Sequence, residues 1–410
     1  MRILALSEHF WPRFGGTATY VHKTCEALSK QGIAVDLLVP GPRPPSVSDG
    51  VMSDLPYTVH WIDADYPISG EPPRSKRYAF CRLAQREVLE RCANPASCPD
   101  TVHVMFGLFL MEVLDTRRLN RRGIQTVATV HNIPPMECAR SWDRSPLKDR
   151  MLERIRLAGV AQKNAARLRK SPYNLYIVPS PPVAEALRGV LGAAAIEVIG
   201  HGVDEDLLNL MNMPADRAPG GGVARIFTAG GWAPHKRQAL IPEIIALLQK
   251  RGVEVLWETA GPSTRIAGYR EAVDESAIQL DVSERLIIDG AVGRQELAAC
   301  YDRANIYVQP STEEGYCLTA LDAAAAGLPV IGCPAGALPE ICSVSGGRVV
   351  QSTPAELADA IATFVETNGW IAEGARGSDW IRREMSWGRA AERLTEAMRH
   401  ACDMADQKIR

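Results

Sequence analysis

The chain has 410 residues, 46% of them hydrophobic and 23% charged, and its formal net charge is −2. This length favours two α/β domains of about 200 residues each, and the near-neutral charge excludes the overall basic field that is typical of nucleic-acid-binding proteins. No run approaches the roughly 18 apolar residues of a membrane-spanning helix, and the first apolar run is too short for a signal peptide. The ten cysteines form no CxxC pair, so we expect reduced thiols and a cytoplasmic protein.

The first forty residues predict a strand, a glycine turn, a helix and a second strand. An apolar strand at 3–6 is followed by Gly15 and Gly16, and a second one at 33–39 ends in the proline-rich stretch 40–45. Between them lies a helix with apolar positions three and four residues apart: Val21, Cys25 and Leu28. This βαβ order predicts a parallel sheet with right-handed crossovers.

Further apolar runs continue the alternation of strands and helices in two series. These runs are 101–105, 126–130 and 175–178, and then 225–228, 253–259, 286–288, 306–308 and 329–331. Residues 200–222 between the series are rich in Pro, Gly and Asp, which is typical of a linker. The predicted fold class is therefore α/β, with two Rossmann-like doubly wound parallel-sheet domains that face an interdomain cleft.

The domain boundaries follow from this pattern. We expect an N-terminal domain at 1–199 and a C-terminal domain at 200–385. The tail 386–410 contains an amphipathic helix that is expected to pack back on the N-terminal domain, with its last residues, 403–410, frayed.

The segment Ser311–Pro334 carries the strongest functional signal. It predicts a polar loop after a strand and then a helix that begins near Cys317 and ends at Gly327. A helix N-terminus with a glycine in the preceding loop can hold a phosphate group, and the carboxylates of Glu314 and Asp322 can accept hydrogen bonds from sugar and ribose hydroxyls. The pattern alone fits equally well with Glu314 as a helix-dipole charge and Asp322 as a solvated residue.

The run Glu314–Asp322, followed by Ala-Ala-Ala-Ala-Gly-Leu-Pro-Val-Ile, resembles the E-x7-E signature of retaining GT-B glycosyltransferases, specifically the GT4 family. The resemblance implies that the domain at 1–199 binds the acceptor and the domain at 200–385 binds the nucleotide-sugar. It implies that Glu314 contacts the donor sugar. It also implies that Asp322, which replaces the usual Glu and has less reach, contacts the ribose. The loop amides that would hold the diphosphate are those of Gly315, Tyr316, Cys317 and Leu318.

Two segments before residue 133 resemble the same family. Pro12–Gly16 is similar to its N-terminal glycine loop, which implies that Gly15 and Gly16 approach the donor phosphate. Thr129–Asn132 is similar to its T-x-H-N pattern, which implies that His131 lies beside the transferred sugar. The resemblance also supports an acceptor site formed by His103, Phe106 and Asn132.

A later segment, Ala229–Lys236, resembles the family's G-R-L-x-x-x-K phosphate segment. It keeps Gly230 and Lys236 but has Gly231 where the family has an arginine. We expect the neighbouring Arg237 to supply the missing positive charge. Alone, Lys236 would be interpreted as a solvated lysine.

The expected function is a retaining transfer of a sugar from an NDP-sugar, with UDP favoured, to a hydroxyl of a small molecule or glycan precursor. Catalytic roles are assigned to His131, Glu314 and Lys236. No metal, no cofactor besides the donor, and no nucleic-acid partner is expected. Two alternatives stay open: a catalytically impaired GT-B nucleotide-binding protein, supported by Gly231 and Asp322, and a transferase acting on a lipid acceptor at the membrane surface. Membrane contact by the basic run Arg74–Arg77 is not favoured over a solvated face.

Overall fold

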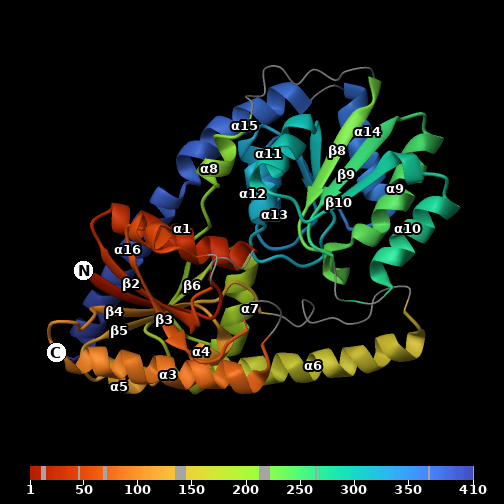
Figure 1. Cartoon of the computed structure of the whole chain (residues 1–410). Coiled ribbons are helices and arrows are strands. Elements are labelled where there is room, and N and C mark those ends of the chain that lie inside the picture. Colours follow the sequence, from red (N-terminus) through yellow and green to blue (C-terminus); the bar gives the residue numbers. More distant parts are fainter. Residues whose placement is uncertain are drawn as a thin grey trace. The chain divides into compact units, whose positions relative to one another are not determined.

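The computed structural model divides the chain into two compact units, each with its own parallel sheet (Figure 1). The first unit contains residues 1–133, 161–201 and 387–410, and the second contains 134–160 and 202–386. The residues that the structure describes are 1–10, 15–44, 47–67, 72–133, 145–211, 222–263, 266, 268–367 and 370–409.

The first unit has a seven-stranded sheet in the order β3-β2-β1-β4-β5-β6-β7. The strands are β1 (Arg2–Ser7), β2 (Ala34–Gly41), β3 (Thr58–Asp63), β4 (Thr101–Phe106), β5 (Gln125–Thr129), β6 (Leu175–Val178) and β7 (Ile196–Val198). All the pairs are parallel, and the central strands are buried because helices cover both faces of the sheet.

The helices of this unit lie in two layers. Helices α1 (Gly16–Lys30) and α16 (Trp387–Ile409) pack on each other, and the Gln125 side chain donates to the carbonyl of Met398 in α16 at 2.7 Å. The other helices are α2 (Asp49–Ser53), α3 (Arg74–Ala93), α4 (Leu108–Val113), α5 (Thr116–Asn120), α7 (Pro181–Leu191) and α6 (Leu147–Lys170), within which the division between the units falls.

The second unit has a six-stranded parallel sheet in the order β10-β9-β8-β11-β12-β13. The strands are β8 (Ala224–Ala229), β9 (Val255–Ala260), β10 (Leu286–Gly290), β11 (Ile306–Gln309), β12 (Val330–Gly332) and β13 (Arg348–Val349). The α-helices are α8 (Glu205–Leu208), α9 (Ile241–Lys250), α10 (Tyr269–Gln279), α11 (Arg294–Arg303), α12 (Leu318–Ala325), α13 (Leu338–Val344), α14 (Pro354–Thr367) and α15 (Trp370–Glu384). The 3-10 helices are η4 (Pro234–Lys236), η5 (Gln238–Leu240) and η6 (Ser283–Arg285). Two separate hydrophobic clusters flank the sheet, one against α11–α13 and the other against α9 and α14.

The α/β class with two Rossmann-like parallel sheets is confirmed. Each predicted strand is present with its ends shifted by at most two residues. The sequence did not predict β3, β7 and β13, because these edge strands are partly exposed and form no continuous apolar run.

Other boundaries differ from the expectations. Helix α12 ends at Ala325, two residues before Gly327, and α16 runs to Ile409. The chain passes between the units at 133–134, 160–161, 201–202 and 386–387. Thus the first described part of the stretch interpreted as a linker folds into the second unit, where Leu207 and Leu208 of α8 are buried in its core.

Candidate functional site

Two loops of the second unit meet through a lysine and a glutamate. Lys236 ends η4, after β8, and Glu314 lies between β11 and α12. Lys236 Nζ donates to Glu314 Oε1 at 2.5 Å, and Gln309 Nε2 donates to the same oxygen at 3.3 Å. Glu314 is only 9% exposed, so Lys236 supplies the counter-charge that a poorly hydrated carboxylate needs.

The backbone fixes the same two loops to each other. The amide of Thr312 donates to the carbonyl of His235 at 2.8 Å, and its hydroxyl donates to the same carbonyl at 3.3 Å. Burial, aided by the positive charge of Lys236, lowers the pKa of His235 to about 4, so its imidazole is neutral at pH 7. Whereas His235 is neutral, the loops bring together two charged groups, the Lys236 ammonium and the Glu314 carboxylate. They lie at the carboxyl edge of the sheet, where doubly wound folds bind ligands.

A buried tyrosine network holds the strand ends behind these loops. The hydroxyl of Tyr307 lies 2.8 Å from Gln309 Oε1, 2.9 Å from the hydroxyl of Thr319 in α12 and 3.2 Å from the carbonyl of Ala229. Because Gln309 also donates to Glu314, this network orients the glutamate. None of these three side chains was predicted from the sequence to belong to the site. The sequence offered one signal for them, because Tyr307 and Gln309 are polar residues in the otherwise apolar strand β11.

The start of α12 is strained. Cys317 caps the helix with a φ of 77° and a ψ of 71°, a left-handed conformation that is uncommon for residues other than glycine and that clusters at functional sites. Burial raises the pKa of its thiol to about 12, so the thiol is un-ionised and is not a nucleophile. Gly336, which the sequence analysis also missed, has a φ of 54°, and a Cβ there would overlap the carbonyl of Glu314.

The glycine segment after β8 is fixed on the segment after β9. The amide of Gly230 donates to the carbonyl of Ala260 at 2.9 Å, and that of Trp232 donates to the carbonyl of Pro262 at 3.0 Å. Gly231 itself has open space: a Cβ there would meet only Pro262 Cγ, at 3.7 Å. Arg237 is left-handed, with a φ of 59°.

Asp322 has partners different from those of Glu314. Its Oδ1 accepts the amide N–H of Asp204 at 3.0 Å, and both Asp204 carboxylate oxygens accept from Arg294 at 2.8 Å. Burial raises the pKa of Asp322 to about 7. One oxygen of the residue expected to bind ribose therefore already accepts a hydrogen bond from the backbone of residue 204.

In the first unit, His131 and His103 are both held by hydrogen bonds. His131 Nε2 lies 2.9 Å from the carbonyl of Met105, which makes it the protonated nitrogen and leaves Nδ1 as an acceptor. His103 is fully buried, with Nε2 2.8 Å from the Thr129 hydroxyl. Burial lowers the pKa of His131 to about 4 and that of His103 to about 3, so both are neutral at pH 7. A contribution of His103 to an acceptor site would be indirect, through Thr129.

The remaining predicted residues of this unit lie at strand and helix ends. Gly15 caps α1 with a φ of 136° and Gly16 begins that helix, whereas Pro12–Phe14 lie outside the described residues. Phe106 packs on His9 with ring centroids 4.4 Å apart, and Asn132 accepts the amide N–H of Ile133 at 2.8 Å.

The basic run at the start of α3 is not simply a solvated face. Arg77 donates to the fully buried Glu8 at 2.6 Å, and its guanidinium lies 4.0 Å from the centre of the Phe109 ring. A buried carboxylate requires such a partner, so Arg77 has a structural role.

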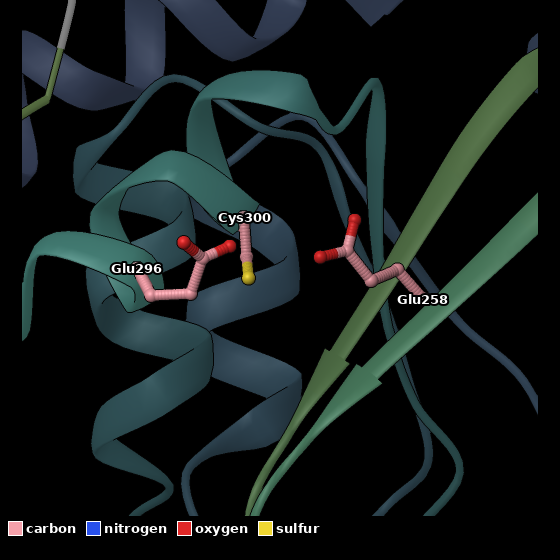
Figure 2. A group of neighbouring side chains, drawn as sticks. All are labelled: Glu258, Glu296 and Cys300. Atoms are coloured by element: carbon pink, nitrogen blue, oxygen red, sulfur yellow. The ribbon is translucent and has the colours of Figure 1, made fainter. Parts of the chain in front are cut away.

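One cluster has the composition of a metal site. The ligand atoms of Glu258, Glu296 and Cys300 lie within 4.8 Å of one another (Figure 2). Arg303, however, donates to Glu258 at 2.5 Å and to Glu296 at 2.9 Å, so a guanidinium already pairs with both carboxylates. The sequence also contains two Asp-x-Asp triplets, a spacing that can bind metal ions. Residues 63–65 lie at the end of β3, where Asp65 is paired with Lys76, and residues 204–206 lie at the start of α8, where Asp204 is paired with Arg294. None of these groups points to a bound metal.

Comparisons with solved structures agree with this architecture. Sucrose-phosphate synthase from Thermosynechococcus elongatus has a TM-score of 0.73 at 20% identity, over 97% of this chain and 98% of its own. HepE of Anabaena, solved with UDP and glucose, has a TM-score of 0.68 at 16% identity, over 98% of this chain and 100% of its own. At these identities the likeness shows the fold.

Curated relatives share more of the sequence. The D-inositol 3-phosphate glycosyltransferase of Mycobacteroides abscessus is 26% identical over 96% of this chain and 88% of its own length. The GDP-mannose-dependent alpha-(1-6)-phosphatidylinositol monomannoside mannosyltransferase of Mycobacterium tuberculosis is 26% identical over 50% of this chain and 56% of its own.

Family models match both halves of the chain. The model for Glycosyltransferase Family 4 matches residues 14–207, and that for Glycosyl transferases group 1 matches residues 224–367. The fold and these matches define a glycosyltransferase of the GT-B type. The chain belongs to the GT4 family, as its motifs indicated.

Proposed function

We propose that the protein transfers a sugar, with retention of anomeric configuration, from an NDP-sugar to a hydroxyl acceptor, with UDP favoured as the nucleotide. The observation that carries this proposal is the Lys236–Glu314 pair beside the start of α12. It joins a cation suited to a diphosphate and a carboxylate suited to sugar hydroxyls at one sheet edge.

The pair also suggests how the donor binds. A diphosphate would draw Lys236 away from Glu314, and the released carboxylate would accept hydroxyls of the sugar while Gln309 keeps it oriented. The helix start at Leu318 adds partial positive charge as the bond to the phosphate breaks. In the family's pattern the neutral imidazole of His131 supports the sugar, and the leaving phosphate takes the acceptor's proton. Charge neutralisation by Lys236 and amides would need no metal.

The acceptor is proposed to be a small molecule or glycan precursor. The first to test is an inositol phosphate, because the relative that matches 96% of this chain is named a D-inositol 3-phosphate glycosyltransferase. A lipid acceptor is the second candidate, because the relative matching half of the chain is named for a phosphatidylinositol mannoside.

The test is nucleotide release from UDP-, GDP- and ADP-sugars, with and without inositol 3-phosphate, followed by NMR of the product. We expect acceptor-stimulated release from one donor class, a product with the donor's anomeric configuration, and loss of release in Glu314→Gln. Inversion would reject the retaining mechanism. No release from any donor by a protein that binds nucleotide would favour the catalytically impaired alternative.

A further inference from the structure

The first half of helix α6 exposes an unusual number of apolar side chains. Among the described residues, eleven large hydrophobic side chains are exposed, and four of these lie within the nine residues 147–155. They are Leu147, Met151, Leu152 and Ile155, with exposed fractions of 71%, 59%, 55% and 73%. Scattered exposed apolar residues are normal, but a contiguous group marks an interaction surface.

These four residues lie on one side of the helix, which we call the α6 apolar face. At about 100° per residue, Leu147, Met151, Ile155 and Leu152 follow one another around about 140° of the helix circumference. Helix α6 is the long yellow helix of Figure 1, so this face extends over more than two turns of regular helix. A continuous stripe of this kind fits a surface rather than a single small ligand.

Positively charged side chains lie beside the α6 apolar face, and negatively charged ones lie on the other side of the helix. At the same angular spacing, the exposed Lys148 falls between Ile155 and Leu152, and the exposed Arg154 borders Leu147. The acidic residues fall on the other side of the helix. Of these, Glu153 is buried and accepts from Arg156 at 2.5 and 2.7 Å. The face therefore combines apolar side chains with positive charge.

We propose that the α6 apolar face docks the protein on the surface of an anionic lipid bilayer. A helix lying in the interface buries its apolar side chains below the headgroups, while Lys148 and Arg154 meet anionic headgroups. A second copy of the chain fits less well, because two such faces would bring their lysines and arginines together without acidic partners. No described helix is long and apolar enough to cross a bilayer. The inference goes beyond the proposed function, since docking requires no particular acceptor.

The test is co-sedimentation of the full chain with vesicles. One set is pure phosphatidylcholine, and the other is an equimolar mixture of phosphatidylcholine and phosphatidylglycerol. We expect binding to the anionic vesicles, with a partition coefficient that falls at least about tenfold in Met151→Ser/Ile155→Ser and in Lys148→Glu/Arg154→Glu. Ile278→Ser is the matched control, because Ile278 is 71% exposed on α10, and it should bind like the unmodified chain.

Thermal unfolding checks that each variant is folded, and sedimentation velocity reports self-association. Equal binding to both vesicle types, no binding to either, or unchanged binding of Met151→Ser/Ile155→Ser would overturn the proposal. Self-association that this variant abolishes, without vesicle binding, would assign the face to a second copy instead.

Discussion

Lys236 and Glu314 neutralise each other at 2.5 Å although 78 residues separate them in the sequence. Their pairing ties the segment after β8 to the loop before α12, so the two residues with the strongest functional prediction also stabilise each other. Stability and activity should therefore respond differently when the pair is changed.

Lys236→Met should destabilise the protein by about 2 kcal/mol, because it leaves a buried carboxylate without its counter-charge. The double variant Lys236→Met/Glu314→Gln should recover most of that loss while remaining inactive in sugar transfer. Urea denaturation and nucleotide release measure the two effects, with the exposed Lys250→Met as control. If the double variant loses as much stability as Lys236→Met and Glu314→Gln lose together, the ion pair contributes nothing in solution.

Asp322→Asn should change stability in a pH-dependent way. Burial raises the folded-state pKa of Asp322 from 3.8 to about 7, so the buried carboxyl costs the folded state free energy, and this cost is full above pH 7, shrinks as the pH falls from 7 to 3.8 and is absent below that. An asparagine can still accept the Asp204 amide, so the variant should be more stable than the unmodified chain at pH 8 and should gain clearly less at pH 5. The measurement is the free energy of unfolding at both pH values, with the exposed Asp379→Asn as control. A pH-independent difference would contradict the raised pKa.

Gly231→Arg should strengthen donor binding. The family's arginine is absent here, and the site has room for a side chain because a Cβ would touch only Pro262. One charge-assisted contact to phosphate is expected to lower the UDP dissociation constant about tenfold. In the unmodified chain Arg237→Ala should raise it by a similar factor, whereas Arg251→Ala, which loses only an ion pair with Asp359, should not. If calorimetry gives unchanged affinity for Arg237→Ala, Arg237 does not replace the missing arginine.

Gly336→Ala should displace the loop that carries Glu314, although Gly336 itself lies outside that loop. The added Cβ would overlap the Glu314 carbonyl and require a left-handed conformation, so the loop must shift. We expect a loss of about 1 to 3 kcal/mol in stability and a weakened response to nucleotide. Gly293→Ala is the control, since its site is open and its φ is −75°. Equal effects of the two substitutions would mean that the close approach has no consequence.

The sequence predicted the centre of the fold better than its edges. Strands such as β1 and β11 are buried on both faces and form clear apolar runs, whereas the partly exposed β3 does not. Motifs identified Lys236 and Glu314, but their mutual contact depends on how two distant loops fold. The same limit applies to Asp322, whose partner Asp204 lies 118 residues earlier in a stretch interpreted as linker.

The central claim is that the loops carrying Lys236 and Glu314 bind the diphosphate of a nucleotide-sugar. Its most direct test is thermal unfolding with UDP-, GDP- and ADP-sugars, because a ligand at about 100 times its dissociation constant adds about 2.7 kcal/mol of stability. We predict that one donor class raises the Tm and that the shift disappears in Lys236→Met/Glu314→Gln. A Tm that no donor raises, or that rises equally in the double variant, would contradict the account.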